Sequence, residues 1–349
     1  MELSTEKTKV VQIRGNKDAD KIGEFKIEEE VKYLGIQIGG RGRDIFQAEN
    51  RNWIQKAEKK ANEIISQIKK SFDKVIIGKA IWKMMSIPGI LFGRAVVVTS
   101  KTAIEKLQRI ENKVWRYLLG IGGYSTVEVL RGEIGASMVK TRIMEAMLLF
   151  IVDTLATDLH KIKKLMNDSI ERGKGKWYNA VDEYRQELGL SWDGLKKMDR
   201  KILKKLIKEY DTTAWKEGMS KKPTMRFYKL GKKKIGYDNC YRNNGPSVFL
   251  AKARTNSLQL EEHKGRGVKH YDSTCRLCGK EVEDIVHFLI KCEKLEEKRE
   301  ARLLDGSIQD PEEMLRILLF ENEKYQETGR MIRNMWMLRK NMRDDLRPP

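Results

Sequence analysis

The densest group of metal-binding side chains in the sequence lies between residues 275 and 292. Three of the four cysteines and one of the four histidines fall there, in the order Cys275-x2-Cys278-x8-His287-x4-Cys292. A structural zinc ion is held by four sulfur or nitrogen donors in a tetrahedron, and a Cys-x2-Cys turn can direct two thiolates at one ion. Gly279, directly after the second cysteine, permits the tight turn that this requires. The pattern therefore predicts a zinc site.

The residues around these donors predict how they are positioned and what the metal does. Apolar residues from Val282 to Ile290 recur at helical spacing, so His287 is expected on a short helix and Cys292 just past its end. Four protein donors leave no open position for a substrate, which favours a structural ion over a catalytic one. His263 or His270 could replace one of the ligands, and Cys240 is expected to be an ordinary thiol. The alternative is a set of unrelated reduced cysteines.

The charge of the chain is strongly basic and unevenly distributed. Its 349 residues contain 70 Lys and Arg against 50 Asp and Glu, a formal net charge of +20. Residues 161–270 alone hold 28 basic against 13 acidic residues. A block of one sign attracts polyanions such as nucleic-acid phosphates, whereas a surface that serves only solubility mixes the signs. An anionic membrane surface is the competing explanation.

Within this block, lysines flank a thin apolar stripe at 201–208, and a second basic stretch at 221–245 is interleaved with aromatic residues. Cations can meet phosphates while bases stack on Phe227, Tyr228, Tyr237 and Tyr241, which is typical of single-strand binding. The stretch 221–245 is expected to be an exposed connection, and the alternative to base stacking is a flexible basic linker whose aromatic residues pack locally. The candidate nucleic-acid-binding residues are Lys201, Lys204, Lys205, Lys208, Lys221, Lys222, Arg226, Lys229, Lys232, Lys233, Lys234, Arg242 and Arg254.

The elements that must position these residues are mostly helices. Strands are expected only near the N-terminus, at 9–13 and 31–38, with a turn at Gly15-Asn16. Long apolar stripes then predict helices over 53–68, from Val75 to an end at 87–89, from a cap at Ser100 or Thr102 to Gly120, and over 139–159. Shorter basic helices follow, and the C-terminal tail reads as two further helices.

Because 349 residues exceed the roughly 250–300 at which a single core stops growing, several domains are expected. The fold class is mainly α, with a small N-terminal β element, a helical thumb-like domain, a basic helical linker and a small zinc-bound module. The expected segments are 1–43, 44–160, 161–252, 253–300 and 301–349. No apolar run approaches a membrane span, no signal peptide is visible and four cysteines make no disulfide framework, so an intracellular setting, nuclear or cytoplasmic, is expected.

Taken in order, these segments resemble the C-terminal part of a LINE-type (non-LTR) retrotransposon reverse transcriptase. Residues 3–11 look like polymerase motif D, with Lys7 at its lysine, and the segment Tyr33-Leu34-Gly35 looks like motif E, the primer-grip hairpin. Residues 44–159, including Leu130–Gly135, look like the thumb and the region that follows it. Ala253-Arg254-Thr255 and the Cys-Cys-His-Cys cluster resemble the zinc knuckle near the end of these proteins.

The resemblance implies binding of RNA or an RNA/DNA hybrid, with target DNA as a further candidate partner, and structural Zn²⁺ as the cofactor. The family's polymerase needs carboxylates for two metal ions, in motif A and in a Tyr/Phe-Ala-Asp-Asp hairpin. Neither occurs in this sequence, and Asp344-Asp345 reads as a solvated pair. We therefore expect no catalysis by this chain on its own, and Lys7 is expected to be vestigial. No nuclease pattern follows the zinc cluster.

Three functions compete at this stage. The first is a truncated reverse-transcriptase fragment that binds RNA or an RNA/DNA template. The second is a host-adopted protein-interaction module with a structural zinc site, for which the charge is incidental. The third is the C-terminal half of an active RNA-directed DNA polymerase whose catalytic half is not in this sequence. The sequence says nothing about the oligomeric state.

Overall fold

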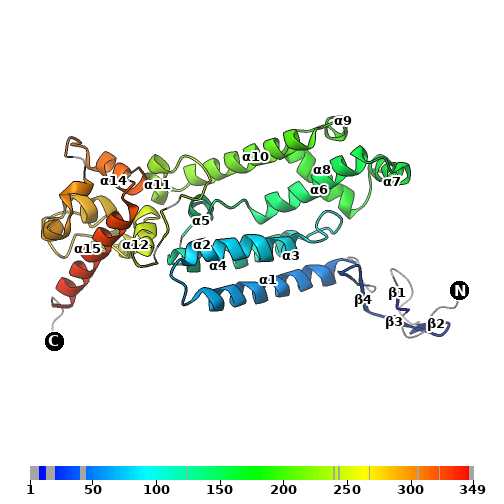
Figure 1. The fold of residues 1–349 in the computed structure, drawn as a ribbon, viewed down its shortest axis with the longest axis horizontal. Helices are drawn as coiled ribbons and strands as arrows, with labels where there is room; N and C mark the ends of the chain where they lie inside the picture. The colour runs from blue at the N-terminus through cyan, green and yellow to red at the C-terminus, as the bar shows by residue number, and fades with distance from the viewer. Residues whose placement is uncertain are drawn as a thin grey trace. The chain divides into compact units, whose positions relative to one another are not determined.

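The computed structural model describes residues 8–12, 20–39, 45–123, 125–238, 240–242, 244–266, 268–304, 306–321 and 323–345. The chain is mainly helical, with a small β element near the N-terminus, as expected (Figure 1). The turn at Gly15-Asn16 and Lys7 lie outside the described residues.

The contacts divide the chain into two compact units. Unit 1 comprises Met1–Glu63, Trp82–Glu111 and Ser137–Asp211, and unit 2 comprises Ile64–Ile81, Asn112–Ala136 and Thr212–Pro349. These units interleave along the chain, whereas the sequence suggested consecutive segments. The reason is that three long helices each contribute residues to both units: α1 (Gln47–Ile68), α4 (Lys101–Leu119) and α10 (Arg200–Ser220).

The β element of unit 1 has two parts. In the first, β3 (Phe25–Glu28) pairs in parallel with β1 (Val10–Val11) and antiparallel with β2 (Lys21–Ile22). In the second, β4 (Glu30–Tyr33) and β5 (Ile36–Gly39) form an antiparallel hairpin. Leu34 and Gly35 both have positive φ, 47° and 85°, as a two-residue hairpin turn requires. A single strand over 31–38 is therefore wrong, because the segment forms a hairpin with its turn at Leu34 and Gly35.

The hairpin is tied to α1 by a buried carboxylate. The backbone N–H of Gln37 donates to Glu49 Oε2 (2.6 Å), and Glu49 is fully buried. Further along the same helix, Trp53 is buried with the guanidinium of Arg94 3.0 Å from its ring centroid. Arg94 also donates to the Ile90 carbonyl (2.8 Å) and to Thr99 Oγ1 (2.7 Å). These contacts join the α1 stripe predicted from the sequence to the segment that follows Pro88.

That segment differs from the prediction. The helix expected to end at 87–89 continues from α2 (Lys74–Ile81) through a π-helical turn, η1 (Trp82–Ser86), into α3 (Ile87–Leu91). Pro88 is the second residue after the π-helical turn and does not terminate the helix, which continues to Leu91. Ser100 supports the start of α4, since its Oγ accepts from the Ala103 N–H (3.2 Å).

The rest of unit 1 is a set of helices around a buried apolar helix, α6 (Val139–Ala156). It packs against α7 (His160–Glu171), α8 (Lys176–Glu187) and α9 (Trp192–Lys196). Thr141 Oγ1 donates to Asp211 (2.7 Å), which joins α6 to the buried face of α10. Leu203 and Ile207 bury that face, so the polar face of α10 is directed to solvent.

Unit 2 is built from shorter helices and a segment with little regular structure. Its remaining elements are α5 (Val127–Ile134), η2 (Pro223–Met225), α11 (Arg226–Gly231), α12 (Asn244–Arg254), α13 (Glu261–Gly265), η3 (His287–Lys291), η4 (Glu293–Lys298), η5 (Ala301–Leu303), α14 (Pro311–Phe320) and α15 (Tyr325–Asp345). The two C-terminal helices confirm the prediction for the tail.

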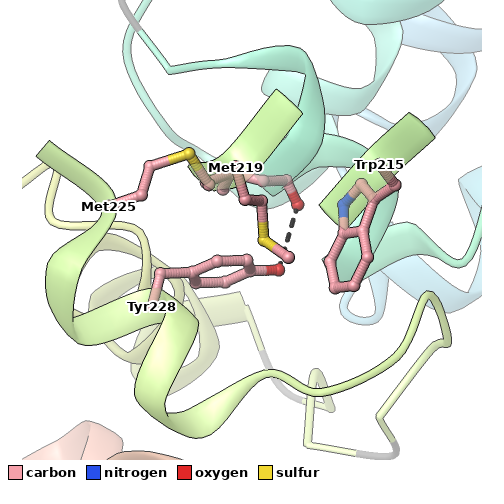
Figure 2. Packing of buried hydrophobic residues seen from close by; sticks show 5 residues of the cluster. Trp215, Met219, Met225 and Tyr228 are labelled. Atoms are coloured by element: carbon pink, nitrogen blue, oxygen red, sulfur yellow. Dashed lines mark hydrogen bonds between the residues drawn. The ribbon is translucent and has the colours of Figure 1, made fainter. Parts of the chain in front are cut away.

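Part of the stretch 221–245 belongs to the core of unit 2, although several of its basic side chains are exposed. Met225 and Tyr228 pack with Trp215, Met219 and Val129 in one buried cluster, and the Tyr228 hydroxyl donates to the Val129 carbonyl (Figure 2). The expectation of an exposed connection is therefore wrong here. Tyr228 and Tyr241 are buried, which agrees with the alternative of locally packed aromatic residues rather than with base stacking.

Helices α12 and α15 pack closely against each other (Figure 1). Gly329 makes this approach possible, because a Cβ at that position would overlap the backbone of Pro246 in α12. Met331, Ile332 and Met335 bury the apolar stripe of α15. The last helix is therefore an integral part of unit 2.

Candidate metal centre

The first two candidate ligands lie on a tight turn. The Cys275 N–H donates to the Glu281 carbonyl (2.7 Å), and the Gly279 N–H donates back to the Cys275 carbonyl (2.8 Å). Gly279 has φ 68°, a left-handed conformation that glycine adopts without strain. This turn carries Cys278 and brings its thiol beside that of Cys275, as the Cys-x2-Cys spacing predicts.

Of the other two candidate ligands, His287 lies on a short helical turn and Cys292 comes directly after it. Its start is held by Asp284, whose Oδ1 accepts from the His287 N–H (2.7 Å). The turn ends at Cys292, whose N–H donates to the His287 carbonyl (2.8 Å). His287 therefore projects from a helix and Cys292 lies past its end, as predicted. Val282, in contrast, is half exposed and pairs with Thr274 in an isolated β-bridge, so it does not belong to this helix.

The donor atoms of Cys275, Cys278, His287 and Cys292 all lie within 4.8 Å of one another, so the cluster could hold a metal ion. Cys275 Sγ is 4.0 Å from Cys292 Sγ, and Cys278 Sγ is 3.3 Å from His287 Nε2. Tetrahedral zinc with bonds of about 2.3 Å to sulfur and about 2.0 Å to nitrogen needs separations of about 3.8 Å and about 3.5 Å. The donor set and its spacing therefore fit zinc.

When no metal is bound, hydrogen bonds between these donor atoms shift their pKa values. A hydrogen bond to Cys292, together with burial, raises the pKa of the Cys275 thiol to about 12, and the same hydrogen bond lowers the pKa of Cys292. A hydrogen bond with Cys275 raises the pKa of His287 to about 9. A bound metal would replace these protons, since only thiolates and neutral imidazole are ligands.

Groups around the cluster are suited to stabilise thiolates and to orient the imidazole. Backbone N–H groups of Leu277 and Cys278 are hydrogen-bonded to Cys275, and the Lys294 N–H is hydrogen-bonded to Cys292. The Glu281 carboxylate lies 3.5 Å from His287 Nδ1, on the side of the ring opposite Nε2. A carboxylate beside the second nitrogen of a ligating histidine holds the ring in the tautomer that binds metal.

A buried ion-pair network links the segment that carries the candidate ligands to the last helix, α15. Arg339 of α15 donates to both oxygens of Glu283 at 2.5 Å and lies 3.4 Å from Glu261. All three side chains are at least 97% buried. Glu283 also accepts from the Glu261 N–H (2.9 Å), so the turn between the second and third ligands, α13 and α15 share one ion-pair network.

Most of the predicted nucleic-acid-binding residues are exposed. Lys201, Lys204, Lys205 and Lys208 belong to unit 1 and lie on the solvent-facing side of α10. In unit 2 the exposed members are Lys221, Arg226, Lys233, Lys234 and Arg242, whereas Lys222 and Lys229 are half-buried. Two of these are engaged by carboxylates, Lys222 by Glu128 and Arg226 by Glu312.

Lys232 and Arg254 are buried, which excludes their charges from the surface. Both pair with Asp238, at 2.5 Å for Lys232, and Arg254 also lies 3.4 Å from Glu133. Their predicted role in nucleic-acid contact is therefore wrong, because their charges are neutralised inside unit 2. Neither the ion pairs of Lys232 and Arg254 nor those of Arg339 were predicted. Charged side chains are normally expected at the surface, and no sequence spacing distinguishes the few that are buried.

The remaining predicted site residues are also located. His263 and His270 are not part of the cluster, and Cys240 is a buried thiol. Tyr33 and Leu34 are exposed at the hairpin turn. Asp344 and Asp345 end the helix α15. Within the described residues, no other group of His, Cys, Asp or Glu is arranged to hold a metal.

Comparisons of the chain with protein-family models, with curated proteins and with solved structures found no match. Among the residues that the structure describes, no helix combines the length and the apolar content that crossing a membrane requires.

Proposed function

We propose that this chain is a nucleic-acid-binding protein, with RNA or an RNA/DNA hybrid as its ligand, organised in part by a structural zinc ion. The resemblance to the C-terminal part of a LINE-type reverse transcriptase belongs to the same proposal. The observation that carries it is the row of lysines on α10. Lys201, Lys204 and Lys208 follow one another at three- and four-residue steps, so they lie on one exposed face.

A row of this kind suits a phosphate backbone. Each lysine that meets a phosphate releases counterions, so binding weakens as salt rises. The contacts read no base sequence, which is consistent with a ligand recognised by its charge and shape.

The zinc ion in this proposal is structural. Three thiolates and one imidazole complete a tetrahedron and leave no place for a reacting water. When bound, the ion would join the turn that carries Cys275 and Cys278 to the helix that carries His287. This fold has no polymerase centre of its own in the proposal, and the chain is expected to bind without catalysis.

The first experiment measures the affinity of a labelled single-stranded RNA over a series of salt concentrations, for the native protein and for Lys201→Gln/Lys204→Gln/Lys208→Gln. The native protein should bind with a steep salt dependence, and the variant should lose up to about 0.7 unit of slope per lost phosphate contact. The control is Lys294→Gln/Lys298→Gln/Lys340→Gln, which removes the same charge from exposed lysines of unit 2. Equal slopes in all three proteins would refute the role of α10.

The metal is tested separately. Zinc analysis of the purified protein should give one ion per chain, and Cys278→Ser should lose it. Unchanged metal content in the variant would refute the ligand assignment.

A second candidate function is protein binding, and one observation favours it. Tyr33, Leu34 and Phe92 are 54–76% exposed, and the Phe92 ring would lie 3.1 Å from a Cβ on Gly35, so they form one apolar surface at the hairpin turn of unit 1. Weak nucleic-acid binding that is insensitive to salt would favour this candidate.

A further inference from the structure

Helix α15 has a packed inner face and an exposed outer face. Met331, Ile332 and Met335 are fully buried against the rest of unit 2, and in Figure 1 the C-terminal half of the helix extends beyond the other elements of this unit. The exposed side chains between residues 328 and 342 recur at three- and four-residue steps, so they lie along one face. They are Arg330, Arg333, Asn334, Met337, Lys340 and Asn341.

The charge on this outer face is of one sign. Residues 328–342 contain four basic residues and no Asp or Glu, whereas residues 293–327 contain 11 acidic and 6 basic residues. Arg330 and Arg333 have no ion-pair partner among the described residues, unlike Arg316 of α14, which pairs with two glutamates. Free charges of one sign beside a mixed surface attract a polyanion.

The kinds of side chain on the face favour nucleobases as well as phosphates. Arg330 and Arg333 each carry a planar fork of donors that fits O6 and N7 of guanine. Asn334 and Asn341 can donate and accept at once, which fits N6 and N7 of adenine. Met337 is 45% exposed and offers an apolar surface to a thymine methyl group. A face of lysines alone would supply charge without distinguishing bases.

The helical geometry favours a DNA duplex over other polyanions. A helix with its side chains is about 10–12 Å across, and the major groove of B-form DNA is about 12 Å wide. The major groove of an RNA duplex is too deep and narrow for side chains to read. An anionic membrane would need an apolar stripe, but Met337 is the one large apolar side chain exposed on the described part of this face.

We propose that the outer face of α15 binds in the major groove of duplex DNA, where Arg330, Arg333, Asn334 and Asn341 contact base edges. The packing of the inner face holds the helix in place, so the side chains are presented without a change in the fold. This inference goes beyond the proposed function. Its ligand is a DNA duplex rather than single-stranded RNA or a hybrid, and its surface contains none of the lysines of α10.

The first test measures the affinity of the full chain for a labelled DNA duplex of mixed sequence and for an RNA duplex of the same sequence. The DNA duplex should bind more tightly. Arg330→Gln/Arg333→Gln should lower its affinity at least about tenfold and reduce the salt slope by up to about 0.9 unit per lost phosphate contact. The control is Lys69→Gln/Lys70→Gln, which removes two exposed charges of unit 2 outside α15. Equal affinities for the two duplexes, or equal losses in the two variants, would overturn the proposal.

The second test selects duplexes from a pool of random DNA sequence. The native protein should enrich a short motif. Asn334→Ala and Asn341→Ala should each relax the preference at one position and leave the salt slope unchanged, because neither removes a charge. Asn179→Ala, an exposed position of unit 1, is the control and should keep the motif. The absence of a motif, or the same motif in all three variants, would exclude base contacts by α15.

These results are separable from the test of the proposed function, which uses single-stranded RNA and the lysines of α10. Binding of RNA without binding of the DNA duplex would overturn this inference alone. Duplex binding that depends on Arg330 and Arg333, with an unchanged RNA salt slope after loss of the lysines of α10, would overturn the proposed role of α10 alone.

Discussion

The Glu281 carboxylate lies 3.5 Å from His287 Nδ1, near enough to orient this candidate ligand when a metal is bound. Glu281→Gln should weaken zinc binding by about 10-fold to 100-fold without removing a ligand. Competition with a chelating dye measures this affinity. Glu293→Gln is the control, since Glu293 is similarly exposed and pairs with Lys280, as Glu281 pairs with Lys291. Equal affinities in the two variants would remove Glu281 from the site.

Cys240 differs from the three candidate ligands in its reactivity. It is 1% exposed, and burial raises its pKa to about 12. A thiol reagent at pH 8 should therefore leave Cys240 unmodified in the folded protein. Addition of a chelator should expose the other thiols, first Cys278, which is only half-buried. Modification of Cys240 before unfolding would contradict this prediction.

The buried Cys240 thiol also determines the direction in which alkaline pH changes the free energy of unfolding. Above its ordinary pKa near 9, Cys240 loses its proton in the unfolded chain but keeps it in the folded one. The unfolded state then binds fewer protons, so the free energy of unfolding falls between about pH 9 and pH 12. Cys240→Ala should reduce this slope, which denaturant titrations at pH 8 and pH 10 would measure.

The cluster of candidate metal ligands was predictable from the sequence because few residue types bind zinc and the Cys-x2-Cys spacing is itself a turn geometry. The buried charges of Arg254 and Arg339 were not. Each is buried only because carboxylates distant in the sequence meet it, Glu133 for Arg254 and Glu283 for Arg339. Such pairing depends on the tertiary fold and leaves no local pattern.

At the scale of elements, α15 is held to the ligand-bearing segment by Arg339. Arg339→Ala would leave the carboxylate of Glu283 buried without its ion-pair partner, whereas Glu261 keeps Lys264, and the expected cost is about 3–5 kcal/mol in the free energy of unfolding. Denaturant unfolding measures this loss. Arg302→Ala, which breaks an exposed pair with Glu300, should cost less than about 1 kcal/mol. Similar losses in the two variants would contradict this role.

The crossing of α12 and α15 depends on a single small residue. Gly329→Ala should destabilise unit 2 by about 1–3 kcal/mol, although alanine favours helices, because its Cβ meets the Pro246 backbone. The exposed Asn334→Ala on the same helix is the control and should be neutral or slightly stabilising. Thermal melting distinguishes them, and a stabilised Gly329→Ala would mean that the two helices separate easily.

Among the helices and strands, too, those marked by a regular local pattern were predicted and the others were not. Long helices such as α1 and α6 were found because their apolar stripes are long and regular. The hairpin at Leu34-Gly35 and the helix past Pro88 were misjudged from periodicity alone, since each depends on the backbone conformation of one or two residues. Residues 221–245 were misjudged because their lysines suggested exposure, whereas Met225 and Tyr228 determine their packing.

At the scale of the whole molecule, loss of the metal should affect one unit only. Every candidate ligand belongs to unit 2. Hydrogen exchange after chelation should therefore accelerate around residues 272–295 and in α15, which Arg339 links to them. The amides of α6, in the core of unit 1, should keep their protection. Faster exchange in α6 would show that the two units unfold together.

The interleaving of the units restricts how this protein could be shortened or recombined. The chain passes from one unit to the other after residues 63, 81, 111, 136 and 211. No single break in the gene would therefore give either unit as one continuous polypeptide. A deletion from either end of the chain would therefore leave at least one unit incomplete. We expect the two units to be kept or lost together.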